Sequence, residues 1–185
     1  MFGRGKPPAP PAQPWALAFL TSDYLVAGLA QPDDYLVSGD DLFDKACNQD
    51  GAEAFQLLTL NGVQLQPASN LEAAPETLPV WNLGLCDTLV AVIPNDDLSR
   101  QAAQRAYSDY KQPVRGIFYI GAYVISGMFL ADPDEGDVLF STERSLRPML
   151  EATVDCRLPG ARLKGWRVPW LLINGRLLHG YQLLP

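Results

Sequence analysis

YLVAGL at residues 24–29 and YVISGM at residues 123–128 follow one pattern. Each reads Tyr, two long or branched apolar residues, a small residue, Gly and an apolar residue. The second copy stands 99 residues after the first. A short match of this kind can arise by chance, so its value depends on whether other segments repeat in the same order.

Three further pairs of segments do repeat in that order. They are GDDLF (39–43) with GDVLF (136–140), FQLLTLNGVQL (55–65) with LRPMLEATVDC (146–156), and LGLCDTLVAVI (83–93) with WLLINGRLLHGY (170–181). Four pairs in one order indicate an internal duplication. The alignment predicts that Gly28 corresponds to Gly127, and Leu89 to Leu177.

Each copy has the texture of short strands joined by turns. ALAFLTSDYLVAGLAQPDDYLVSG at 16–39 alternates apolar runs with Gly, Pro and Asp, which is typical of strands and tight turns. About five short strands can bury a core by curling into a small barrel, which also removes exposed edges. We therefore expect a mainly β protein made of two tandem small β-barrels joined by one α-helix.

The chain divides into four predicted parts. A helix is expected where Asn95 to Asp97 offer capping side chains and Pro113 prevents continuation. The predicted parts are a Pro-rich flexible tail (1–14), a first barrel repeat (15–94), a connecting helix (95–112) and a second barrel repeat (113–185).

The closing segments carry a resemblance to a known family. VPWLLINGRLLHGYQLLP at 168–185 and LGLCDTLVAVIP at 83–94 resemble the second motif of Sm-like barrels, and the chain is similar to uncharacterised bacterial proteins of tandem Sm-like or SH3-like barrels. The resemblance implies small barrels that pair through edge strands. The family's Asp-x-apolar-Asn signature is absent, and Cys86–Asp87 and Asn174–Gly175 replace its Arg-Gly pair, so RNA binding does not follow.

Charge is distributed unevenly along the chain, whose formal net charge is −7. Residues 1–112 carry 6 Lys/Arg against 14 Asp/Glu, whereas residues 113–185 carry 8 against 7. The acidic balance argues against general nucleic-acid binding, which requires clustered cations. Beyond Asp155 there are five basic residues and no acid.

This basic C-terminal stretch is the predicted partner-binding site. Aromatic side chains interleaved with Arg can anchor a protein interface or stack on nucleic-acid bases. Trp166 stands inside the stretch and is expected to be partly exposed. The candidate site residues are Arg162, Lys164, Trp166, Arg167 and Arg176.

Catalytic and metal chemistry find little support. His179 is the single histidine, and no Gly-x-Ser-x-Gly motif provides a nucleophile. Cys47, Cys86 and Cys156 are scattered and form no Cys-x-x-Cys pair, so free thiols in a reducing compartment are expected. The sequence thus predicts no catalytic residues, no metal and no cofactor, and a cytoplasmic rather than membrane protein, because no apolar stretch reaches 18 residues.

Taken together, these features predict a non-enzymatic binding or assembly module that self-associates or docks a protein partner. Two alternatives stay open. One is a nucleic-acid-binding protein that uses the basic C-terminal barrel. The other is a split-barrel enzyme that binds a flavin between subunits.

Overall fold

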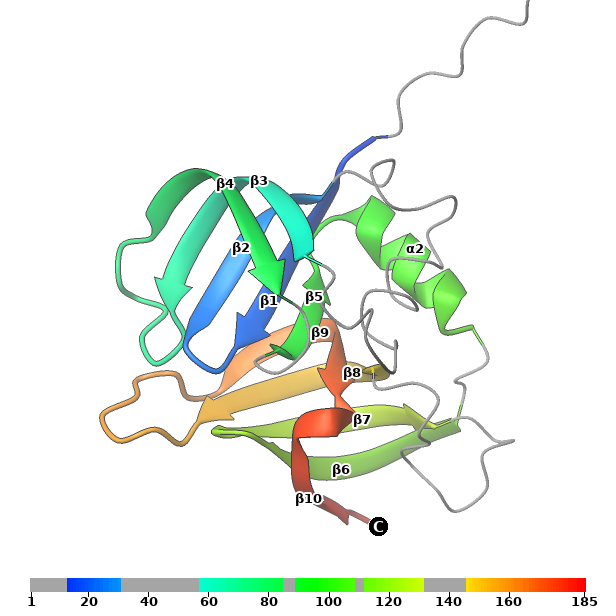
Figure 1. Ribbon diagram of the computed structural model, residues 1–185. Coiled ribbons are helices and arrows are strands. Elements are labelled where there is room, and N and C mark those ends of the chain that lie inside the picture. Colours follow the sequence, from blue (N-terminus) through cyan, green and yellow to red (C-terminus); the bar gives the residue numbers. More distant parts are fainter. Residues whose placement is uncertain (1–12, 31–56, 85–88, 109–111, 132–145) are drawn as a thin grey trace, which may run out of the picture.

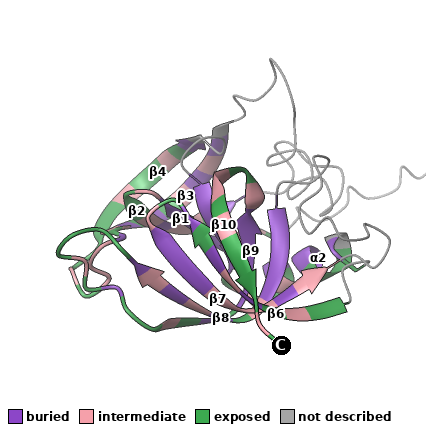
Figure 2. Ribbon diagram, turned by 90° about the horizontal axis from the view of Figure 1, so that it is seen from below, coloured by how far each residue is buried: buried purple, intermediate pink, exposed green. Residues whose placement is uncertain are grey.

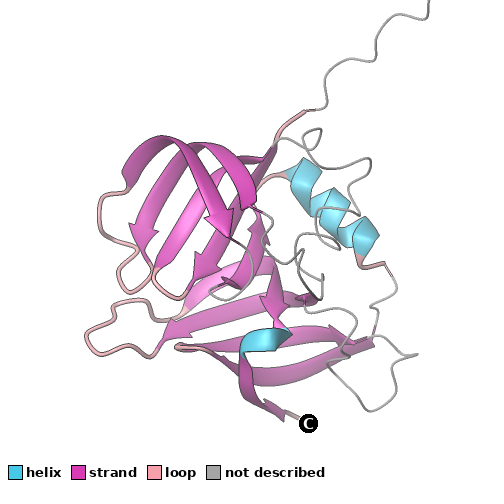
Figure 3. Ribbon diagram, in the orientation of Figure 1, coloured by secondary structure: helices cyan, strands magenta, loops and turns pink. Residues whose placement is uncertain are grey.

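The computed structural model describes residues 13–30, 57–84, 89–108, 112–131 and 146–185, which form ten strands and the helix α2 (Figures 1 and 3). The first five strands are β1 (Trp15–Thr21), β2 (Tyr24–Ala30), β3 (Leu57–Pro67), β4 (Glu76–Gly84) and β5 (Leu89–Pro94). The second five are β6 (Gln112–Ile120), β7 (Tyr123–Ala131), β8 (Leu146–Cys156), β9 (Trp166–Asn174) and β10 (Leu178–Leu183). The turn η3 (Gly175–Leu177) precedes β10.

All ten strands belong to one antiparallel sheet, in the order β10-β6-β7-β8-β9-β5-β1-β2-β3-β4. The mainly β prediction is confirmed, but the sheet is open, and it does not form the two closed barrels that were expected. The physical reason is the partner of β5. Its outer edge pairs with β9, where Ala91 lies opposite Ile173 and Val92 opposite Leu172, and not with β4.

The sheet contains one five-stranded arrangement twice. The first repeat (β1–β5) has the order β5-β1-β2-β3-β4, and the second repeat (β6–β10) has β10-β6-β7-β8-β9. Gly28 and Gly127 occupy the same place, since the pairing of each glycine's strand with the next strand shifts register at that residue. The predicted correspondence of these two glycines therefore holds in the structure.

A bend in the middle of β3 and β8 also repeats. Gly62 and Glu151 are the sixth residues of these two 11-residue strands, and both have a positive φ, of 56° and 49°. Opposite them stand Pro79 and Pro169, where the ladder is interrupted. Proline lacks an N–H and suits a position without a ladder hydrogen bond. The bend aligns residue 57 with residue 146, so the sequence alignment of 55 with 146 was wrong by two residues.

The strands that end each repeat share a third irregularity. Leu89 lies opposite Thr21 and Ala91 opposite Leu20, so Val90 is the extra residue in β5. In β10, the extra residue between Leu178 and Gly180 is His179. Leu89 therefore corresponds to Leu178. The predicted match to Leu177 was wrong by one residue, because the bulges set the register.

Two hydrophobic cores lie on opposite faces of the central strands. Figure 2 shows how buried and exposed residues are distributed over the strands. The first core takes Leu17 and Phe19 from β1, while the second core takes Ala18 and Leu20 from the alternate positions. Because both faces are covered, all six residues of β5 are buried. A fully apolar strand of this kind is the signature of burial on two sides. The outer strands β4 and β10 are mostly exposed.

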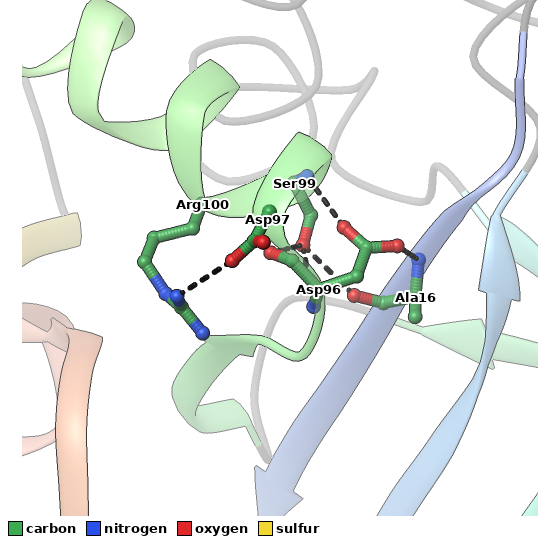
Figure 4. A network of polar contacts seen from close by, with 5 residues as sticks. All are labelled: Ala16, Asp96, Asp97, Ser99 and Arg100. Carbon is green, nitrogen blue, oxygen red and sulfur yellow. Dashed lines mark hydrogen bonds and ion pairs between the residues drawn. The ribbon is translucent and has the colours of Figure 1, made fainter.

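Helix α2 (Asp97–Ala106) follows β5 and covers one side of the first core with Ala102, Ala103 and Tyr107. Its N-cap is Asp96, whose carboxylate accepts hydrogen bonds from the backbone N–H of Ser99 (2.6 Å) and of Ala16 (2.7 Å) (Figure 4). The hydroxyl of Ser99 donates to the carbonyl oxygen of Ala16 (3.0 Å). The cap therefore fastens the helix to β1. The helix is shorter than the predicted span of 95–112.

Candidate interaction surfaces

The structure brings four of the five predicted site residues together. Arg162 and Lys164 lie in the loop between β8 and β9, and Trp166 and Arg167 begin β9. Arg176 lies in η3 beyond the other end of β9. Eight residue steps along a strand correspond to about 26 Å. Arg176 therefore does not belong to the same surface patch, which we call the basic loop (Arg162, Lys164, Trp166 and Arg167).

The backbone of the basic loop is fixed against the first repeat. The N–H groups of Arg162 and Leu163 both donate to the carbonyl oxygen of Ser69, at 2.6 and 3.3 Å. At its end, the N–H of Gly165 donates to the Asp155 carboxylate (2.7 Å). The loop is thus held at both ends of its charged segment, which limits the entropy that a partner would have to restrict on binding.

The charged side chains of this loop are exposed to solvent, whereas its aromatic side chain is partly buried. Arg162, Lys164 and Arg167 are exposed, but Trp166 is half-buried and packs against the second core. Partial exposure of Trp166 was predicted and is confirmed. An anchor that is already packed has less apolar area to offer a partner than a fully exposed ring.

Two shallow hollows lie on the surface of the second repeat and share part of their lining. The larger, of about 440 Å³, is lined by residues 151–153 and 167–169. The smaller, of about 230 Å³, reaches across to Arg115 and Ser126. Both share Glu151 and Thr153. This surface offers two guanidinium groups, a carboxylate and hydroxyls, a set that can hydrogen-bond polar groups of a partner.

Glu151 is the conformational outlier of this face. A residue with a side chain in the left-handed region is uncommon, and strain of this kind clusters at functional sites. The equivalent residue of the first repeat is Gly62, which adopts the same conformation freely. Sequence analysis missed Glu151, although the repeated prolines at 79 and 169 mark the place of the bend.

Arg147 was also missed. It is fully buried on β8, opposite Ile173 and close to the joint between the repeats. The equivalent residue in β3 is the buried Leu58. Fully buried arginine is rare, because a charge withdrawn from water needs compensation. No periodic pattern distinguishes such an arginine from an exposed one.

The remaining chemistry-bearing residues lie apart. His179 is exposed on β10. Cys156 is a free, buried thiol, and Cys47 and Cys86 lie outside the described residues. Among the residues that the structure describes, no three His, Cys, Asp or Glu side chains gather as a metal site would need. The described helices include none with the length and apolar character to cross a bilayer.

The two ends of the sheet form a second kind of surface. Within the described residues, β4 pairs only with β3, and β10 pairs only with β6. In the part of the chain that the structure describes, each of these strands therefore has one edge without a partner strand. Edge strands with free N–H and C=O groups are templates for pairing with another strand. β4 and β10 lie at opposite ends of the strand order, so the chain has two different edges.

The chain matches no family model, no curated protein and no solved structure.

Proposed function

We propose that the protein is a non-enzymatic assembly module that associates with further copies of itself. The observation that supports this most is the joint between β5 and β9. Here the chain connects two versions of one five-stranded arrangement edge to edge. Among the described strands, the same arrangement leaves one edge of each repeat without a partner strand, so contacts of the same type between chains are geometrically available.

The charge distribution indicates which repeats of two associating chains would meet. The N-terminal part of the chain is acidic, and the basic loop of the second repeat exposes Arg162, Lys164 and Arg167. Complementary charges steer association and set orientation more than they add affinity. The second repeat of one chain would thus be drawn toward the first repeat of another.

Sedimentation velocity over a range of protein concentrations tests the proposal. We expect the weight-average mass to rise with concentration and to fall toward the monomer on dilution. A monomer at every concentration and salt level would contradict the proposal.

A pair of charge variants tests the steering. The double substitution Lys164→Glu and Arg167→Glu should slow association at low salt, and the effect should disappear at high salt, where charges are screened. Arg100→Glu with Arg105→Glu makes the same change of charge on α2 and should leave association unaltered. Circular dichroism verifies that both variants are folded.

Nucleic-acid binding is the second candidate, and the exposed cations of the basic loop are the observation that favours it. A labelled single-stranded oligonucleotide would then bind at low salt, and the Lys164/Arg167 variant would lose this binding. Together with a monomeric wild-type protein, that outcome would replace the assembly proposal. Visible absorbance by the purified protein would instead point to the flavin alternative.

A further inference from the structure

Comparing equivalent residues in the two repeats shows where the exposed apolar side chains lie. Five of them stand at positions whose counterparts in the other repeat are buried. One is Leu183 (44%), whose counterpart is the buried Pro94. The other four pairs, with exposed fractions, are Tyr24 (42%) with Tyr123 (1%), Val80 (50%) with Trp170 (5%), Tyr119 (44%) with Leu20 (0%), and Tyr181 (48%) with Val92 (1%). The correspondence follows from the strand registers.

The buried members of these pairs are covered at the β5–β9 joint. Trp170 of β9 packs into the first core, which consists mainly of residues from the first repeat. Leu20 of β1 packs into the second core, which consists mainly of residues from the second repeat. Each repeat therefore completes the core of the other. Tyr123 acts in the same way, since its hydroxyl donates to the carbonyl oxygens of Thr21 and Ser22 across the joint.

The exposed members fall into two sets, one at each end of the sheet. Tyr24 and Val80 belong to the first repeat, on the side that β4 ends. Tyr119 and Tyr181 belong to the second repeat, on the side that β10 ends. Tyr24 and Val80 correspond to Tyr123 and Trp170, which the second repeat contributes to the internal joint. Tyr119 and Tyr181 correspond to Leu20 and Val92, which the first repeat contributes to the internal joint.

We propose that β10 of one chain pairs antiparallel with β4 of another copy of the same chain, in the geometry of the internal β5–β9 joint. This inference rests on the self-association proposed above and specifies its surface. The internal pairs Ala91–Ile173 and Val92–Leu172 translate into Gly180 opposite Leu83, and Tyr181 opposite Asn82. The hydroxyl of Tyr24 would then lie at the β6–β7 turn of the neighbouring chain, at residues 120–121.

The joint between chains is weaker than the joint within the chain. The side-chain amide of Asn174 donates to the carbonyl oxygen of Leu89 (2.8 Å) across the internal joint, and Gly84 occupies the position equivalent to Asn174. Val80 and Asn82 replace the larger apolar surface of Trp170 and Leu172. Less apolar area and one hydrogen bond fewer make a reversible contact. Because the two edges differ, the contact is heterologous, and the chains add head to tail.

A complementation experiment tests this arrangement. Val80→Asp damages only the β4 edge, and Tyr181→Asp damages only the β10 edge. Each variant alone should sediment as a monomer. An equimolar mixture should form a one-to-one dimer, because β10 of the first variant and β4 of the second are intact. Leu98→Asp, at an exposed apolar residue of α2, is the matched control and should associate like the wild type.

Register is tested by cross-linking, in chains whose Cys47 and Cys86 are replaced by Ser. Asn82→Cys mixed with Tyr181→Cys should form a disulfide-linked dimer on mild oxidation, since directly opposite residues have the spacing that the bond needs. Asn82→Cys mixed with Leu183→Cys, two residues out of register, should cross-link at least about tenfold more slowly.

The outcomes separate the two proposals. If the wild-type protein is a monomer at all concentrations, both fail. If it associates but Val80→Asp and Tyr181→Asp associate equally well, the edge pairing is wrong and the assembly function stands. Tyr181 stacks on Phe118 with ring centroids 6.2 Å apart, so its substitution could unfold β10. Tyr119→Asp, which alters the same surface from β6, must then give the same complementation.

Discussion

The hydroxyl of Tyr123 lies 3.1 Å from the carbonyl oxygen of Thr21, the last residue of β1. A side chain of the second repeat therefore donates a hydrogen bond to the end of the first strand of the first repeat. The ring is buried and belongs to the second core. Tyr24, its counterpart, has the same place in the first repeat and is exposed. One residue type thus occupies two environments that differ in what covers them.

This contrast predicts a difference between two conservative variants. Tyr123→Phe should lower the free energy of unfolding by about 1 kcal/mol, because the buried carbonyl of Thr21 loses its donor. Tyr24→Phe should leave the stability of the monomer unchanged. Urea unfolding followed by circular dichroism measures both. Equal stabilities of the two variants would show that the hydrogen bond across the joint contributes nothing.

The same tyrosine predicts a limit at alkaline pH. Burial, followed by the neighbouring Cys156 and Asp23, raises the pKa of Tyr123 above its ordinary value of 10.0. The folded protein therefore holds a proton that the unfolded chain releases above pH 10, and stability falls as pH rises past that value. Absorbance of phenolate should show one tyrosine that ionises only with unfolding, and this late ionisation should vanish in Tyr123→Phe.

Glu151 predicts a stabilising substitution. Glu151→Gly should raise the free energy of unfolding by about 1 kcal/mol, because glycine adopts a positive φ without a steric penalty. Gly62→Ala at the equivalent bend should lower stability by a similar amount. A loss of stability in Glu151→Gly would mean that contacts of the carboxylate outweigh the backbone strain. A loss of association without loss of stability would give the hollow a role in partner binding.

The repeated glycines predict a graded series of alanine variants. A Cβ on Gly127 would stand 2.7 Å from the carbonyl oxygen of Leu150, a backbone atom that cannot move alone. A Cβ on Gly28 would meet Leu60 Cβ at 3.1 Å, whereas at Gly180 it would meet nothing within 4 Å. Thermal unfolding should therefore rank the loss as Gly127→Ala, then Gly28→Ala, then Gly180→Ala. A Gly127→Ala protein as stable as Gly180→Ala would contradict the close packing of β7 on β8.

Asp96 predicts an acid-sensitive connection between α2 and β1. Burial alone would raise the pKa of its carboxyl, but hydrogen bonds from the N–H groups of Ser99 and Ala16 outweigh that effect and lower the pKa. The stabilisation is complete above the ordinary value of 3.8 and is lost as pH falls through the lower folded value. Asp96→Ala should cost about 1–2 kcal/mol at neutral pH, typical of a lost N-cap.

The matched control for Asp96 is Asp97→Ala on the same helix turn. Asp97 forms an exposed ion pair with Arg100 at 3.0 Å, and such pairs contribute about 0.5 kcal/mol or less. The difference between the two variants should shrink as pH falls through the lowered pKa of Asp96, because protonation weakens the hydrogen bonds that its carboxyl accepts from Ser99 and Ala16. A constant difference from pH 7 to pH 2 would mean that the helix loses something other than the charged cap.

The sequence predicted the strands and the repetition because local patterns report them. Alternating apolar residues, Gly28 with Gly127, and the breaks at Pro and Gly are properties of a strand and its turns, and each is visible without knowledge of the partner strand. The cap at Asp96 was visible in the same way, as an acidic residue before an amphipathic segment.

The open sheet could not be predicted from these patterns. Closure of a barrel depends on which strand pairs with the outer edge of β5. Ala91 and Val92 are apolar and could pair equally well with β4 or with β9. One clue was present: β5 is apolar at every position, which is typical of a strand covered on both faces. The alignment errors at Leu177 and at residue 55 have a related cause, since bulges insert residues that sequence identity does not mark.

The candidate surfaces were predicted only in part. The clustering of Arg162, Lys164 and Arg167 followed from their closeness in sequence. Arg176 was separated from them because a nine-residue strand intervenes. The left-handed conformation of Glu151 and the complete burial of Arg147 depend on tertiary packing. Neither property can be predicted from the residue type.

The burial of β5 on both faces has a mechanical consequence. Side chains of β5 and β1 contribute to both cores, so a rotation of one repeat against the other would have to open two packed interiors together. Among the residues that the structure describes there is therefore no hinge between the repeats, and a partner bound to one repeat would not act by closing the other over it. Any response to binding must come from the ends of the sheet, where strands can be gained or lost without disturbing its centre.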